Sequence, residues 1–99
     1  MPIERDIVTE EIDRIKAAFG EVVRRRRIDA GLEQRVFSRM ANMGNSHLRQ
    51  IEQGQVSPSL TTITKIALAL GTDAGDLVSQ ACRLGDDPSR LGGAANTKK

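Results

Sequence analysis

Side chains suited to hydrogen bonding, rather than to covalent chemistry, gather between residues 34 and 50. Asn45, Ser46, Arg49 and Gln50 fall within six consecutive positions. Their amide, hydroxyl and guanidinium groups can bond the edges of nucleic-acid bases or phosphate oxygens, with Asn or Gln suited to adenine and Arg to guanine. The sequence has no glycine-rich phosphate loop and no nucleophile in a recognisable turn motif. We therefore expect binding, and no enzyme activity.

Positive charge is concentrated in the same region. The net charge of the 99 residues is +2, but residues 1–21 carry −3 and residues 50–99 are balanced. Residues 22–49 carry +5, which favours a polyanionic partner because neutralised phosphates release counterions. Four of these arginines form one run, which either pairs with the acidic N-terminal segment or contacts DNA. The basic residues of this region are Arg24, Arg25, Arg26, Arg27, Arg35, Arg39 and Arg49.

Several classes of protein are disfavoured by composition. One cysteine, Cys82, and one histidine, His47, are too few for an intrachain disulfide or a structural zinc site, so we expect no metal and no cofactor. We expect Cys82 to be a half-buried small apolar residue. No run of 18 apolar residues exists, and the charged start of the chain is unlike a secretory signal, which favours a cytoplasmic protein.

Three helices are predicted between positions 8 and 53, and they must position the candidate binding residues. Apolar residues at spacings of three and four predict a first helix from Val8 to Asp29, with Thr9 as its cap, Gly20 as a point where it could divide, and Gly31 as its end. A second helix is predicted over residues 33–41 and a third over residues 45–53, joined by Asn42, Met43 and Gly44 and ended by Gly54. Their predicted inward residues are Ile12, Ile15, Phe19, Val22, Val23, Val36, Phe37, Met40, Leu48 and Ile51.

Two further helices complete the predicted all-α fold. The fourth runs to Leu70, is capped by Ser57 or Ser59, and buries Leu60, Ile63, Ile66, Ala67 and Leu70. The fifth covers residues 73–82, is capped by Thr72 or Asp73, and buries Leu77 and Val78. Residues 83–99 are rich in turn formers, so we expect a disordered tail. The predicted organisation is an N-terminal helical extension (1–18), one domain (19–82) and the tail (83–99).

Two short helices joined by three residues, the second with a polar outer face, are typical of a helix-turn-helix. The segments FGEVVRRRRIDAGLEQ, LRQIEQGQVSPSL and ITKIALALGTDAGDL extend this pattern over residues 19–77. In these segments the chain resembles the phage-repressor-like (Cro/C1-type, XRE) regulators, in which the second helix of the motif lies in the DNA major groove. The resemblance implies a five-helix, lambda-repressor-like domain that regulates transcription, as a homodimer on a palindromic operator.

The resemblance also implies roles for individual residues. Gln34 matches a glutamine that touches a phosphate, and Arg27 and Glu52 match a pair that forms an orienting salt bridge in several members. The pattern is not followed everywhere, because Glu33 and Gly44 stand where helix caps are usual. Further departures are Asn42 for the turn glycine, Arg26 for leucine and Ser38 for alanine. The expected DNA-binding residues are Gln34, Arg35, Arg39, Asn45, Ser46, His47, Arg49 and Gln50.

The N-terminal extension leaves a second function open. Its acidic residues stand beside Ile7, Ile12 and Ile15, a composition that suits a partner-binding or dimer surface. A protein of this fold could therefore act as an antitoxin or adaptor that grips a protein partner through its N-terminal helix or its C-terminal tail.

Overall fold

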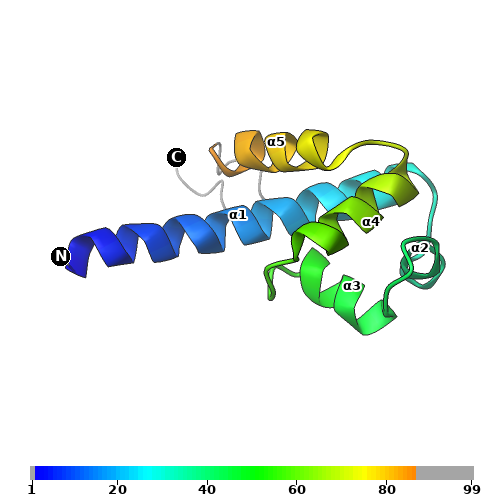
Figure 1. Ribbon diagram of the computed structural model, residues 1–99, viewed down its shortest axis with the longest axis horizontal. Coiled ribbons are helices and arrows are strands. Elements are labelled where there is room, and N and C mark those ends of the chain that lie inside the picture. The colour runs from blue at the N-terminus through cyan, green and yellow to red at the C-terminus, as the bar shows by residue number, and fades with distance from the viewer. Residues whose placement is uncertain (1, 87–99) are drawn as a thin grey trace, which may run out of the picture.

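Five helices, joined by short connections, account for most of the described chain in the computed structural model (Figure 1). The structure describes the backbone of residues 2–86 and the side chains of residues 7–86, and no strand occurs in that part. The helices are α1 (Pro2–Asp29), α2 (Gln34–Met40), α3 (Asn45–Glu52), α4 (Leu60–Leu70) and α5 (Ala74–Gly85). The predicted all-α fold of five helices is confirmed, whereas the predicted tail lies, from residue 87 onward, outside the described residues.

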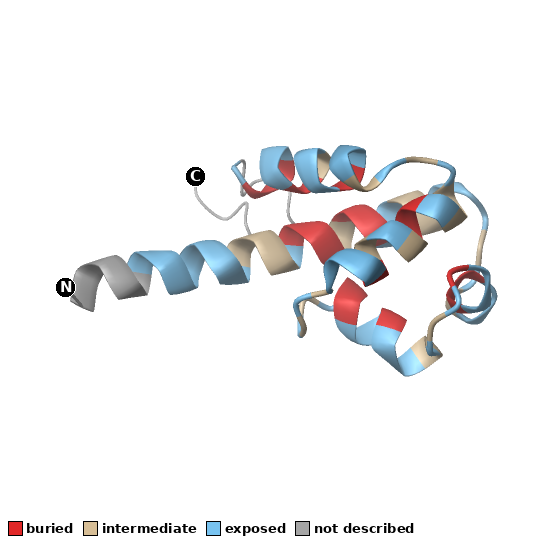
Figure 2. Cartoon of the chain, in the orientation of Figure 1, coloured by how far each residue is buried: buried red, intermediate tan, exposed pale blue. Residues whose placement is uncertain are grey.

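Helix α1 is the scaffold on which the other helices are assembled. Its C-terminal half packs against α5, α3 and α4, while α2 reaches the body through α3 (Figure 1). Its N-terminal part projects past the other helices, and the side chains of residues 7–13 there are exposed (Figure 2). The helix is therefore a core element at one end and a free surface at the other.

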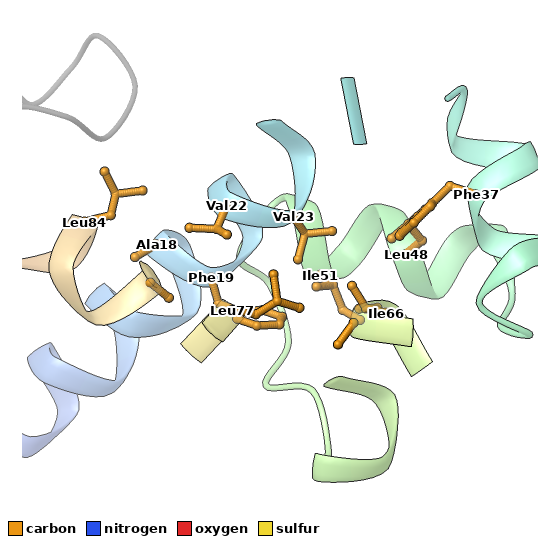
Figure 3. Packing of buried hydrophobic residues seen from close by; sticks show 12 residues of the cluster. Ala18, Phe19, Val22, Val23, Phe37, Leu48, Ile51, Ile66, Leu77 and Leu84 are labelled. Atoms are coloured by element: carbon orange, nitrogen blue, oxygen red, sulfur yellow. The ribbon is translucent and has the colours of Figure 1, made fainter. Parts of the chain in front are cut away.

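One hydrophobic core joins all five helices (Figure 3). Each helix supplies at least one fully buried apolar side chain, and Leu32 and Met43 pack against the cluster from the connections between helices. Burying side chains of this size stabilises the fold by about 1.5–3 kcal/mol each. The largest fully buried residues are Val23, Phe37, Leu48, Ile51, Ile66 and Leu77.

Gly20 sets the distance between α1 and α3. A Cβ atom at this position would lie 2.2 Å from the carbonyl oxygen of Ile51 and 2.8 Å from that of Glu52. The two backbones approach so closely that only glycine fits. The close approach explains why residue 20 is glycine. The first helix is continuous through this position and does not divide there.

The helix ends follow local signals. Pro2 is the first residue of α1, a position where proline is favoured, so the predicted start at Val8 and the cap at Thr9 are wrong. Ser59 caps α4 by accepting a hydrogen bond from the Thr62 N–H. Asp73 caps α5 in the same way through the Asp76 N–H, and α5 continues to Gly85 rather than ending at Cys82. Gly31, Gly54 and Gly71 adopt positive φ just after helix ends, and Asn42 does so in the turn.

Some residues predicted to be buried lie at the rim of the core. Val36 and Met40 are 37% and 51% exposed, because α2 turns the face with Phe37, Ser38 and Ala41 inward. Leu60, in the first turn of α4, is exposed, and Thr62 takes the inward position. In α5 the inward positions are 77, 81 and 84, which leaves Val78 partly exposed and Cys82 exposed rather than half-buried.

A polar clamp holds α5 against α1. The Arg26 guanidinium donates to the Gln80 amide oxygen at 2.8 and 3.0 Å and also bonds Asp76, which accepts from the Thr72 hydroxyl at 3.0 Å. The family resemblance implies leucine at position 26. The hydrogen bonds of Arg26 to Gln80 and Asp76 explain why arginine stands there instead. The hydrogen bond from Arg26, followed by that from Thr72, lowers the pKa of Asp76 below its ordinary value of 3.8.

The crossing at Gly20 predicts an unusual response to alanine. Although alanine favours a helix by about 1 kcal/mol, Gly20→Ala should lower the free energy of unfolding by about 2 kcal/mol, because the added Cβ forces α3 away. Gly85→Ala is the matched control, since a Cβ there meets only ordinary contacts at 3.6 Å. Urea denaturation checks both variants, and equal effects would contradict the close approach.

The clamp predicts a dependence of stability on acidity. A carboxyl whose pKa is lower in the folded state stabilises the fold above its ordinary pKa of 3.8 and loses this effect as the pH falls through the folded pKa. Asp76→Asn should therefore make the thermal midpoint fall less steeply below about pH 4 than it does in the wild type. Parallel acid limbs of the two curves would show that the clamp contributes nothing.

Candidate nucleic-acid interface

Helices α2 and α3 form a tight corner held by backbone bonds. Asn42 adopts a φ of 55°, and the Met43 N–H bonds the Ser38 carbonyl at 2.9 Å. The Lys65 ammonium, from α4, donates to the Asn42 carbonyl at 3.2 Å. Neither Glu33 nor Gly44 caps its helix with a side chain, so the corner is shaped by the backbone and by Met43, which packs against the core.

One face of α3 is buried and the opposite face is polar and exposed. Leu48, Ile51 and Glu52 point inward, whereas Ser46, Arg49 and Gln50 line a shallow polar hollow of about 230 Å³. The hollow is completed by Gln53 and Gln55, which sequence analysis did not select. The sequence does indicate Gln53, because it follows Gln50 by three positions and Arg49 by four and so shares their helical face.

The remaining candidates surround this face without lining the hollow. His47 is exposed on α3, and Asn45 is half-buried, with a buried Oδ1 that has no hydrogen-bond partner among the described residues. Arg35 and Arg39 are exposed on α2, and neither makes an ion pair with a described residue. The structure thus gathers Ser46, Arg49 and Gln50 and leaves two positive charges free on the neighbouring helix.

A buried network ties α3 to α1 and α2. Arg27 donates to both carboxylate oxygens of Glu52, at 2.7 and 3.0 Å, so the expected pair is present, and it also bonds the Leu32 carbonyl at 2.8 Å. The Glu52 side chain is only 3% exposed and that of Arg27 only 11%. Gln34 joins the network through its Nε2, which donates to Glu52 at 2.9 Å. Because a carboxylate only accepts, the Gln34 amide is oriented with its Oε1 away from Glu52.

Other functional centres find little support in residues 7–86. No cluster of three potential metal ligands occurs among them. No helix of the described chain has the length and apolar character needed to cross a membrane. The polar face of α3 and its basic neighbour α2 are the candidate site, because their polar and positively charged side chains are exposed side by side.

A family model described as "Helix-turn-helix" matches residues 23–77, which include α2, the turn, α3, α4 and the start of α5. The chain belongs to this XRE-type helix-turn-helix family. The family is one of DNA-binding transcription regulators and not of enzymes. No match was found among curated proteins.

Solved structures of two regulators resemble the XRE-type chain. The restriction-modification controller protein C.AhdI from Aeromonas hydrophila is 31% identical, with a TM-score of 0.60 over 62% of this chain and 92% of that protein. The clp gene regulator ClgR from Corynebacterium glutamicum is 22% identical, with a TM-score of 0.69 over 73% of this chain and 77% of that one. A second ClgR structure has a TM-score of 0.65 at 23% identity and covers 70% of this chain and 88% of that one. The ClgR likeness shows the fold alone.

The buried network predicts a large loss of stability when it is broken. Arg27→Met should lower the free energy of unfolding by about 3 kcal/mol, because the Glu52 carboxylate stays buried without its counter-charge. Arg24→Met is the matched control, since the pair that Arg24 forms with Glu21 is exposed and should change stability by about 0.5 kcal/mol or less.

A second substitution tests the cause of that loss. Arg27→Met combined with Glu52→Met removes both charges, so the double variant should be more stable than Arg27→Met alone. Chemical denaturation measures all variants. If the double variant were less stable than the single one, the buried charge would not be the cause.

Proposed function

We propose that the chain is a sequence-specific transcriptional regulator that binds as a homodimer to a palindromic operator, with α3 in the major groove. The observation that carries this proposal is the exposed polar face of α3, where Ser46, Arg49 and Gln50 gather around one hollow. The helix-turn-helix family match and the likeness to C.AhdI, which is described as a controller protein, support a regulatory role.

Base recognition is assigned to the outer face of α3. Arg49 suits guanine and Gln50 suits adenine, since each presents two hydrogen-bonding atoms to a base edge. Gln53 and Gln55 extend the same surface toward the flanking positions. Ser46, His47 and the half-buried Asn45 lie at its start, where they contact bases or the sugar-phosphate backbone.

Sequence-independent affinity is assigned to α2. Arg35 and Arg39 present guanidinium groups that no described carboxylate neutralises, so they attract phosphates. Gln34 has one Nε2 hydrogen committed to Glu52 and a second one left to donate. That hydrogen binds a phosphate, and the bond to Glu52 fixes where it points.

Substitutions on the two helices should affect DNA binding differently. Arg49→Ala or Gln50→Ala removes a base contact worth about 1–3 kcal/mol, so preference for the operator over other DNA falls by about 5- to 150-fold. Arg35→Ala or Arg39→Ala weakens binding to all DNA and lowers the slope of log affinity against log salt by about 1.

The measurement begins with selection of a binding site from a random DNA pool by the wild-type protein. Titrations of that site and of an unrelated duplex, each at two salt concentrations, then separate specificity from charge. Leu68→Ala, at an exposed position on α4, is the control that should alter neither. Equal effects of the α2 and α3 substitutions on both quantities would contradict the assignment.

A further inference from the structure

A second polar hollow lies between α1 and α5, away from the candidate nucleic-acid interface. Its volume is about 230 Å³, the same as that of the hollow on α3. Val22 of α1 and Leu84 of α5 line it with apolar side chains, and both residues are buried. Its polar lining consists of Arg25 from α1 and of Gln80 and Arg83 from α5. None of these five lining residues is acidic, so the polar wall is basic.

Gln80 offers hydrogen-bond donors to a ligand in this hollow. Its amide oxygen accepts two hydrogen bonds from the Arg26 guanidinium, at 2.8 and 3.0 Å, and is thus committed to the polar clamp between α1 and α5. Its Nε2 carries two hydrogens and donates to none of the described residues. The half-buried amide is therefore held in place by its oxygen, while its two donors are left for a ligand.

Arg83 contributes a positive charge that no described carboxylate neutralises. Its Nη1 donates to the Ser79 hydroxyl at 2.9 Å, and it forms no ion pair with a residue in the described part of the chain. A guanidinium has five N–H donors, so most of them remain after the bond to Ser79. Arg25 adds a second positive charge, although its Nε bonds the Glu21 carboxylate at 2.7 Å. The polar lining thus carries two positive charges, of which Glu21 balances one.

We propose that this hollow binds a small oxyanion, the phosphate or carboxylate group of a low-molecular-weight ligand, between the Arg83 guanidinium and the Gln80 amide. Such groups accept several hydrogen bonds at once, and they match the planar fork of an arginine. Charge-assisted hydrogen bonds of this kind are about twice as strong as those between neutral groups. Val22 and Leu84 form the apolar part of the wall, against which the carbon portion of an organic anion packs.

The hollow faces away from α3. Successive residues turn by about 100° in a helix, so Val22 and Arg25 lie about 160° and about 140° around α1 from Gly20. Gly20 marks the place where α3 crosses α1. The hollow is thus nearly opposite α3, in agreement with Figure 1, where α3 and α5 lie on different sides of α1. A duplex bound to the polar face of α3 leaves this hollow uncovered, so the anion is not a phosphate of that DNA.

Binding of an anion should strengthen the contact between α1 and α5. Gln80 belongs both to the hollow and to the polar clamp, so a ligand that bonds its Nε2 also holds the amide oxygen in place for Arg26. A ligand that binds only the folded chain stabilises it by mass action. The thermal midpoint of the protein should therefore rise with the concentration of the anion at constant ionic strength.

A nuclear magnetic resonance titration of the full chain with inorganic phosphate tests the site. At neutral pH and constant ionic strength, the backbone amides of residues 22–25 and 80–84 should shift and reach saturation. Arg83→Met should raise the phosphate dissociation constant by about tenfold or more, because charge-assisted hydrogen bonds are lost. Arg24→Met is the matched control, since it removes the same charge from an exposed position of α1 that does not line the hollow.

A substitution of Gln80 separates ligand binding from the structural role of this residue. In Gln80→Glu an oxygen that can accept from Arg26 is kept, whereas the two amide donors are lost and a negative charge is added. This variant should keep the helical content of the wild type by circular dichroism, and phosphate should cause no saturable shift around the hollow. Phosphate binding equal to that of the wild type would show that the amide donors hold no anion.

The remaining outcomes identify the ligand or overturn the site. A parallel titration with acetate distinguishes the two sources, since tighter binding of acetate points to a carboxylate ligand and tighter binding of phosphate to a phosphorylated one. Equal weakening by Arg24→Met and Arg83→Met would overturn the site, because net charge alone would then attract the anion. So would shifts around the hollow that duplex DNA causes and neither anion does. None of these outcomes bears on the proposed function, which is tested at α2 and α3.

Discussion

The position of α3 depends on one buried carboxylate. Glu52 stands at the end of α3 and accepts hydrogen bonds from Arg27 on α1 and from Gln34 on α2. Arg27 also bonds the Leu32 carbonyl in the connection between those helices. Three elements are therefore fixed relative to one another by a single ion pair, which is valuable in a domain whose second and third helices have only seven and eight residues. Short helices gain little stability alone and need tertiary contacts.

Gln34 belongs both to this buried network and to the proposed contact with a phosphate. Gln34, the first residue of α2, donates one amide hydrogen to Glu52 of α3, so under the proposed function its other amide hydrogen is already oriented when it meets the phosphate. Pre-organisation of this kind lowers the entropy lost on binding. Arg26 has a comparable structural role, since it bonds Gln80 and Asp76 of α5. Two neighbouring arginines thus bond different helices, and the charge of each is paired with a carboxylate of the same chain.

Much of the fold could be predicted because local signals specify it. Gly31, Gly54 and Asn42 mark helix ends and the turn through conformations that other residues adopt with strain. Periodicity predicted less well which apolar residues are buried, as Val36 and Leu60 show, because a helix at the rim turns only a narrow face to its neighbours. The ion pair between Arg27 and Glu52 was predicted from the family resemblance and not from helical periodicity. Gln55 could not be predicted from helical spacing, because it lies beyond the end of α3 and joins the polar hollow only in the folded chain.

The size of α3 limits what a single domain can read. Leu48, Ile51 and Glu52 anchor the helix, so only a few of its eight residues remain for bases. Each good base contact discriminates by about 1–3 kcal/mol, whereas specific binding exceeds non-specific binding by about 4–10 kcal/mol. Two or three such contacts supply about 2–9 kcal/mol together, so they reach the upper part of that range only when each is near its maximum. Under the proposed function, a second copy doubles their number. Helix α1 contributes to this function indirectly, because it packs against α3 and shares with it the core that fixes the position of α3.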